Sequence, residues 1–232
     1  MRGKKLILAL TAAMCLTGCG AAGQAEVVQP QPAAFTDKAG DEMPDGTYNV
    51  SFTSDDLQKK DDGYVLTMEF YNYDSYSKED ALALKEGSVI NITVNEVVDG
   101  TFKAERKDLT IDSIETSEND NGDVDMITIN GGIENNGVEL YWDEDFDVFV
   151  NRTMDDHPVF YSIGTGTIPV STDMTFQDCY DADTLPDGVV TYYDDLPDSL
   201  INAEQQGDFT NIAMQAVIRD GKIVQLIRNW IP

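Results

Sequence analysis

The most regular feature of the chain is an alternation of apolar and polar residues over short runs. In the segment 64–70 the even positions, from Tyr64 to Phe70, are apolar, while Thr67 and Glu69 are polar. The segments 90–95, 138–142 and 146–150 repeat this period of two. One apolar and one polar face on an extended run are typical of a half-buried antiparallel strand. We therefore expect a strand in each of these four segments.

The C-terminus carries the clearest turn signal. Residues 212–219 and 223–231 are strand-like and flank Asp220-Gly221. A two-residue connection of this type suits a type I′ turn, in which both central residues need positive φ. The pattern predicts a terminal β-hairpin.

Helix signals are few and short. Ser77 is placed to cap a helical stretch that Gly87 would close, and 195–206 has a proline near its first turn. Strand and helix units do not alternate along the chain. We predict an all-β fold, mainly an antiparallel barrel or sandwich, with one or two short helices.

The N-terminus follows a different pattern. Three basic residues among the first five positions precede the apolar run 6–16, which is shorter than the roughly 20 residues needed to cross a hydrocarbon core. Leu16-Thr17-Gly18-Cys19 follows. A basic start, a short apolar run and small residues are the layout of a cleaved export signal. Because the signal ends in Leu-Thr-Gly-Cys, the segment resembles the lipobox of bacterial lipoproteins.

The resemblance implies cleavage before Cys19 and attachment of acyl chains to its thiol and amine. One acyl chain holds a protein to a bilayer only reversibly, whereas two or three make the attachment effectively permanent. The expected organisation is a signal peptide over 1–18, a lipidated cysteine with a flexible tether over 19–41, and a single β-rich domain over 42–232. The expected location is the extracytoplasmic side of a bacterial cell membrane.

The charge of the chain restricts its partners. Loss of the signal would remove three of the 15 basic residues and none of the 43 acidic ones, leaving a formal charge of −31. Nucleic acids and anionic headgroups both require a positive surface. We therefore expect no nucleic-acid partner, and membrane contact only through the lipid anchor on Cys19.

Clustered carboxylates raise the possibility of calcium, which binds carboxylate and carbonyl oxygens. Asp178, Asp181 and Asp183 lie close together in a predicted loop and are the candidate ligands. The alternative is a solvated acidic surface. No other cofactor is indicated.

Aromatic residues beside acidic ones suggest a second kind of site. Tyr141, Trp142, Tyr192 and Tyr193 could stack on sugars or on cationic groups. Trp142 shares its phase with Val138 and Leu140, so packing in the core is the competing interpretation.

Catalytic arrangements have little support in the sequence. His157 is the only histidine, so a Ser–His–Asp triad would depend on it alone. We expect a non-catalytic domain that binds an envelope protein or a carbohydrate, or that scaffolds an envelope assembly. Two alternatives remain: a calcium-stabilised carbohydrate-binding module, and an envelope hydrolase with two carboxylates facing each other in an aromatic-lined cleft.

Overall fold

The computed structural model describes residues 27–32, 36, 38–98, 101–153, 155–181 and 188–230, with 31, 32, 96–98 and 101–103 described by their backbone alone. The all-β prediction is confirmed. The strands are β1 (Val27–Val28), β2 (Gln31–Pro32), β3 (Gly46–Ser51), β4 (Leu57–Lys60), β5 (Gly63–Ser77), β6 (Val89–Val98), β7 (Thr101–Thr110), β8 (Ile114–Glu118), β9 (Val124–Ile129), β10 (Val138–Asp143), β11 (Val148–Asn151), β12 (Phe160–Asp178), β13 (Val189–Tyr192), β14 (Met214–Arg219) and β15 (Lys222–Arg228). The two α-helices are α1 (Lys78–Leu82) and α2 (Leu196–Glu204).

Five of these strands close into a barrel. β5 pairs antiparallel with β3 on one side and with β12 on the other. β12 pairs in parallel with β15, β15 pairs with β14, and β14 pairs back to β3. Each of the five strands therefore pairs with two others, and the barrel is closed.

The connectivity of this barrel is that of the OB-fold. Numbered along the chain, the barrel strands follow the order 1-2-3-5-4-1, with strands 3 and 5 parallel and α2 between strands 3 and 4. The OB-fold is a five-stranded Greek-key barrel that uses the face of strands 2 and 3 and the adjoining loops to bind ligands. Here strands 2 and 3 are β5 and β12.

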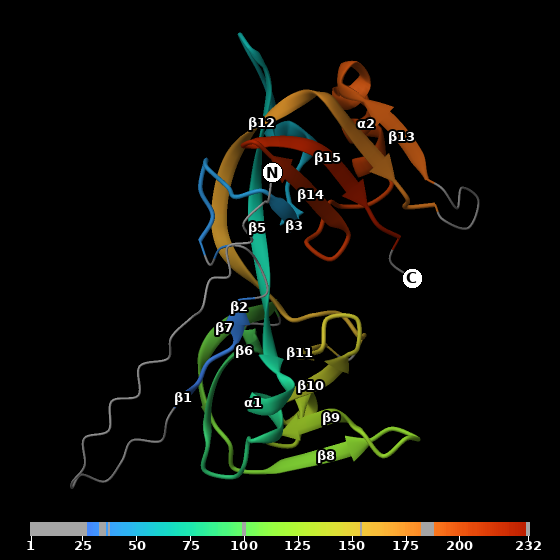
Figure 1. Ribbon diagram of the computed structural model, residues 1–232. Coiled ribbons are helices and arrows are strands. Elements are labelled where there is room, and N and C mark those ends of the chain that lie inside the picture. Colours follow the sequence, from blue (N-terminus) through green and yellow to red (C-terminus); the bar gives the residue numbers. More distant parts are fainter. Residues whose placement is uncertain are drawn as a thin grey trace, which may run out of the picture.

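A second lobe is inserted between β5 and β12. It contains α1 and β6 to β11, and it lies at the opposite end of β5 from the barrel (Figure 1). β5 belongs to both lobes, because its later residues Ser75–Ser77 pair with β11. Fifteen residues at about 3.3 Å each let one strand span roughly 50 Å. β5 therefore runs through both lobes and connects them.

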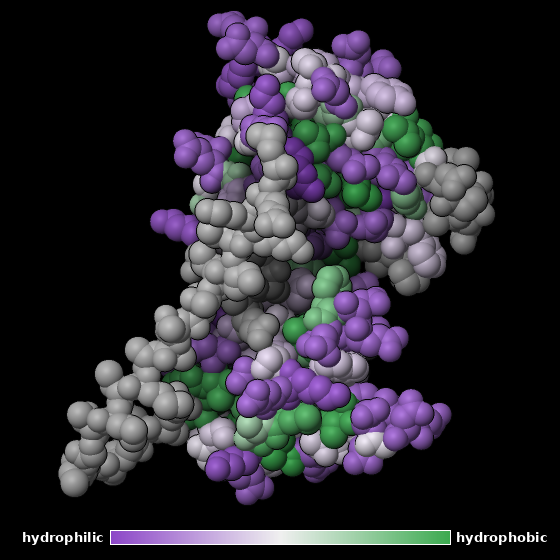
Figure 2. Space-filling view, viewed as in Figure 1, coloured by the Kyte–Doolittle hydropathy of each residue, from purple (hydrophilic) through white to green (hydrophobic). Residues whose placement is uncertain are grey.

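Each lobe has its own apolar core. The barrel core is formed by alternate residues of the five strands together with Leu196, Leu200 and Ala203 of α2. The second core lies around Tyr76, Ile92 and Phe149. Hydrophilic side chains project from both lobes on the face drawn in Figure 2, with smaller apolar areas between them. Among the described residues, no helix has the length and apolarity to cross a bilayer.

The local predictions can be compared with these elements. Strands at 64–70, 90–95 and 138–142 are confirmed, and Asp220 and Gly221 both have positive φ, of 50° and 68°. The strand expected from Phe146 instead begins at Val148, so that part of the prediction is wrong. Asp147 has a φ of 57°, which places the preceding residues in a turn and leaves Phe146 70% exposed.

Part of the predicted tether lies against the folded chain. β1 pairs in parallel with β6, and β2 pairs with Asp74 and Ser75 of β5. Further on, the Ala39 amide donates to the Ile163 carbonyl of β12 at 2.7 Å. Cys19 lies outside the described residues.

Candidate functional site

One candidate site is a groove on the outer face of the barrel. It has a volume of about 310 Å³ and lies over β5 and β12, next to the loop that follows β3. Its lining combines hydroxyls, two carboxylates and two apolar side chains: Ser51, Thr53, Thr67, Thr165, Asp56, Glu69, Phe52 and Met68. We call it the barrel groove. Its position matches the ligand-binding face of OB-folds.

The alternation of the strands explains why the groove is polar. Leu66, Met68 and Phe70 are buried in the barrel core, so Thr67 and Glu69 between them point outward. Thr67 pairs with Thr167 across the sheet, and their hydroxyl oxygens are 3.0 Å apart. The backbone of two paired strands thereby fixes the spacing of these hydroxyls.

Both carboxylates of the groove already accept hydrogen bonds from the chain. One oxygen of Asp56 accepts from the Thr53 amide at 2.7 Å and from the Thr53 hydroxyl at 2.8 Å. Glu69 accepts from the Tyr71 hydroxyl at 2.9 Å, and that hydroxyl also lies 2.9 Å from the Ser51 oxygen. Burial, with a contribution from Glu69, raises the pKa of Tyr71, so this phenol remains a donor at neutral pH.

The wall of the groove is attached to α2. The amide of Ser54 donates to a carboxylate oxygen of Glu204 at 3.1 Å, and the Ser54 hydroxyl donates to the same oxygen. The loop after β3 is therefore held at both ends, by the barrel and by the helix. Such support keeps the groove in one shape before any ligand arrives.

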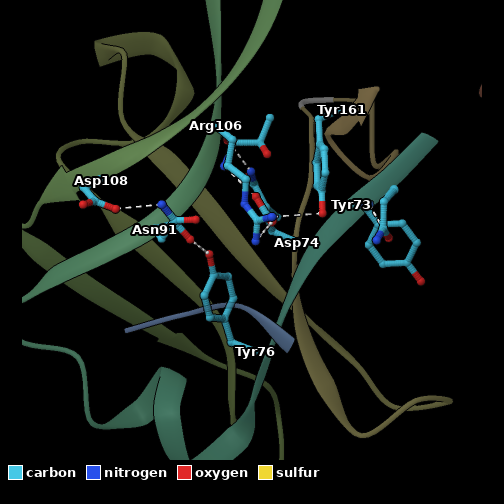
Figure 3. Close-up of polar contacts among 10 residues, drawn as sticks. Tyr73, Asp74, Tyr76, Asn91, Arg106, Asp108 and Tyr161 are labelled. Atoms are coloured by element: carbon cyan, nitrogen blue, oxygen red, sulfur yellow. Dashed lines mark hydrogen bonds and ion pairs between the residues drawn. The ribbon is translucent and has the colours of Figure 1, made fainter. Parts of the chain in front are cut away.

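A second polar cluster lies where β5 passes from the barrel to the inserted lobe (Figure 3). Asp74 is fully buried and accepts a hydrogen bond of 2.6 Å from the Thr93 amide of β6. Its other oxygen is 3.2 Å from Nη2 of Arg106 on β7. Arg106 also donates to the hydroxyl of Tyr161 on β12 at 3.2 Å and lies over that ring. Four strands thus meet at one carboxylate.

Burial raises the pKa of Asp74, and donation from Thr93 and the charge of Arg106 partly oppose the rise. Beside it, the Tyr76 hydroxyl donates to the Asn91 carbonyl at 2.6 Å, and burial raises the pKa of Tyr76 well above its usual value. The side-chain amide of Asn91 in turn donates to the carboxylate of Asp108 at 2.7 Å. One oxygen of Asp74 thus accepts from the backbone of β6, and the other faces the guanidinium of Arg106. The cluster joins the two lobes rather than presenting a reactive group.

The predicted calcium ligands are placed differently from one another. Asp178 ends β12, where one oxygen accepts from the Tyr180 amide at 3.0 Å and the other lies 3.4 Å from Nη1 of Arg228. Asp181 is exposed, and Asp183 lies outside the described residues. Within the described ranges, no group of three or more potential ligands is arranged to hold a metal ion. The calcium site remains a prediction.

Arg228 is the reason that Asp178 is already engaged. Its side chain is 1% exposed and donates to the carbonyls of Ala203 and Gly207, at 2.7 and 2.8 Å. The guanidinium lies 4.0 Å from the centroid of the Tyr180 ring. The arginine therefore ties the end of α2 to the last barrel strand.

The four predicted aromatic ligands divide between the lobes. Tyr141 and Trp142 lie on β10, where the Tyr141 hydroxyl donates to Glu139 at 2.7 Å and Trp142 packs against Phe149. The bond to Glu139 is the main cause that raises the pKa of Tyr141 to about 12. On the barrel, Tyr193 packs against Tyr64, while Tyr192 is 66% exposed. The structure does not bring the four into one site.

Sequence reasoning missed the barrel groove, Asp74 and Arg228. A signal existed for the two charged residues. Asp74 is an even number of residues from the buried Leu66 and Phe70, and Arg228 is two residues from the buried Leu226, so each lies on the buried face of its strand. A charged residue in phase with a buried face indicates a buried ion pair. The groove had a weaker signal, in the polar face of the run 64–70.

No family model, curated protein or solved structure matches the chain at a significant level.

Proposed function

We propose that the protein is a lipid-anchored, extracytoplasmic and non-catalytic binding domain that takes a polyhydroxylated ligand, a carbohydrate, in the barrel groove. The observation that carries the proposal is the row of hydroxyls fixed across β3, β5 and β12. Ser51, Thr67 and Thr165 all line the groove, beside the carboxylates Asp56 and Glu69.

The chemistry of the lining suits a sugar. A hydroxyl both donates and accepts, and a carboxylate accepts, so together they complement ligand hydroxyls in either role. OB-folds bind oligonucleotides or oligosaccharides on this face. The charge of the chain, −28 overall, opposes a polyanion and favours the second class. The hydroxyls and carboxylates of the lining support a sugar ligand independently of the fold.

The hydrogen bonds of the two carboxylates favour binding over hydrolysis. Asp56 is held by Thr53, and Glu69 by Tyr71. A glycosidase needs one carboxyl group to be a proton donor and the other to be a nucleophile or base. In this groove both act as positioned acceptors.

Calorimetric titration of the non-lipidated Cys19→Ala chain with a panel of neutral oligosaccharides tests the ligand class. Thr67→Val and Thr165→Val keep the shape and remove one hydroxyl each. A lost neutral hydrogen bond costs about 1 kcal/mol, so each variant should weaken binding roughly fivefold. Thr191→Val on β13, outside the groove, is the matched control. Affinity that is the same in all four proteins would remove the groove from the proposal.

The anchor is tested separately, in cells of a lipoprotein-producing bacterium. Labelled palmitate should be incorporated into the wild-type chain and not into Cys19→Ala, and the wild type should fractionate with membranes. An unlabelled wild-type chain released into the medium would end the anchoring proposal while leaving the ligand proposal open.

A further inference from the structure

The edge of the sheet at β13 has a composition that sets it apart from the other edge strands of four or more residues in the described chain. β13 pairs with Thr175–Asp178 of β12 and stands last in the strand order, with no second partner among the described residues. Its sequence is Val-Val-Thr-Tyr. Val189, Val190 and Tyr192 are 49%, 47% and 66% exposed, a dense group of apolar side chains for so short a strand.

The other edge strands of four or more residues in the described chain carry charged residues. β8, at the opposite end of the strand order, has the exposed Glu115 and Glu118. β4 has the exposed Lys59 and Lys60. Charges, prolines and bulges on an edge strand are the means by which proteins prevent unwanted pairing. β13 has none of the three, and its register with β12 is unbroken.

The charge around β13 limits what can pair with it. The sequence from Asp178 to Gln206 contains eight acidic residues and no Lys, Arg or His. Asp181 precedes the strand and Asp194 and Asp195 follow it, all three exposed. A second copy would bring the same acidic residues to the interface, whereas a basic segment would be attracted.

We propose that the free edge of β13 accepts an extended, basic segment of a partner protein as an added strand. Main-chain hydrogen bonds along the edge would provide affinity, and alternate side chains would provide selectivity. Val190 and Tyr192 lie on the same face of the strand, because side chains alternate, and they offer an apolar contact to every second residue of the partner. The surface shares no lining residue with the barrel groove.

The test uses the Cys19→Ala chain and a labelled ten-residue peptide of alternating lysine and valine, followed by fluorescence anisotropy. Two altered peptides separate the causes of binding. One is N-methylated at every residue, which removes the hydrogen-bond donors from both edges of the strand, and the other replaces each lysine by glutamate. The parent peptide should bind at least tenfold more tightly than either.

The double variant Val190→Lys/Tyr192→Lys places charges on the edge and should weaken binding of the parent peptide at least tenfold. Phe146→Lys is the matched control, since Phe146 is 70% exposed and lies in the inserted lobe. It should bind within twofold of wild type, as should Thr67→Val. Because Val190, Tyr192 and Phe146 are exposed, circular dichroism should show unchanged melting for the two lysine variants.

Three results would overturn the proposal. The first is an absence of peptide binding by the wild type at millimolar concentration. The second is equal affinity for the parent and N-methylated peptides, which would show charge attraction without strand pairing, or equal affinity for wild type and the double variant, which would show that the peptide binds elsewhere. The third is a wild-type dimer in sedimentation equilibrium that the double variant abolishes, which would make a second copy the occupant.

Discussion

Arg228 should be one of the side chains on which the stability of the barrel depends most, and its replacement by alanine is a direct test. The side chain is 1% exposed, and it donates to two backbone carbonyls and pairs with Asp178 at 3.4 Å. Hydrogen bonds from a charged donor contribute about 1.5–3 kcal/mol each, and removal of one partner of a buried ion pair costs about 3–5 kcal/mol. The two ranges describe overlapping interactions and are not added.

We therefore expect Arg228→Ala to lower the free energy of unfolding by about 3–5 kcal/mol. In a domain of 150–250 residues each kcal/mol corresponds to roughly 2–4 °C, so the midpoint should fall by about 6–20 °C. The stability of Arg228→Lys should lie between those of the wild type and Arg228→Ala, because an ammonium lacks the planar fork that reaches both carbonyls. Urea denaturation and thermal melting of the Cys19→Ala chain, followed by circular dichroism, provide the measurement.

Arg219→Ala is the matched control, since it removes the same charge from an exposed position in β14. Its effect should stay within about 0.5 kcal/mol. If Arg228→Ala unfolds within about 1 kcal/mol of wild type, the interpretation of Arg228 as the tie between α2 and the barrel is wrong. A loss as large in Arg219→Ala would point to net charge rather than to the buried contacts.

Three further predictions concern other parts of the molecule. Because burial raises the pKa of Asp74, the native chain holds a proton at a pH where the unfolded chain has released it. Urea titrations between pH 7 and pH 4 should therefore show that the wild type gains stability relative to Asp74→Asn as the pH falls. A stability difference that stays constant over this range would contradict the raised pKa. Gly166→Ala should melt at least several degrees lower, because a Cβ there would lie 2.2 Å from the Gly40 carbonyl oxygen, whereas a Cβ at Gly40 meets no atom within 4 Å, so Gly40→Ala should cost far less. If the acidic loop binds calcium, millimolar Ca²⁺ but not Mg²⁺ should raise the melting midpoint by several degrees, and Asp181→Asn should reduce that rise. Equal small shifts of the midpoint with both ions would mean a solvated acidic surface.

The parts of the fold that follow from neighbours in the sequence could be predicted. Alternation over 64–70 identified both the strand and its buried face, and Asp220-Gly221 identified the turn. These predictions depend on side-chain period and on backbone angles at two residues, which the local sequence determines. The prediction that a strand begins at Phe146 was wrong because the apolar–polar alternation extends beyond the strand into the preceding turn.

Barrel closure could not be predicted in the same way. Thr67 lies opposite Thr167, a pairing between residues a hundred positions apart, and nothing in either segment specifies the other. Within β12 the register shifts between Ser162 and Gly164, which breaks the alternation that would have marked one long strand. The barrel groove depends on this pairing, so its hydroxyls could not be grouped from the sequence.

The pairing of β1 with β6 sets how far the molecule can reach from a bilayer. If Cys19 carries the proposed acyl chains, eight residue steps separate it from Val27, and a fully extended chain covers at most about 3.3–3.6 Å per residue. Val27, where the chain meets the inserted lobe, would then stay within roughly 28 Å of the lipid surface. The barrel lies at the other end of β5 and would have the longer reach from the bilayer.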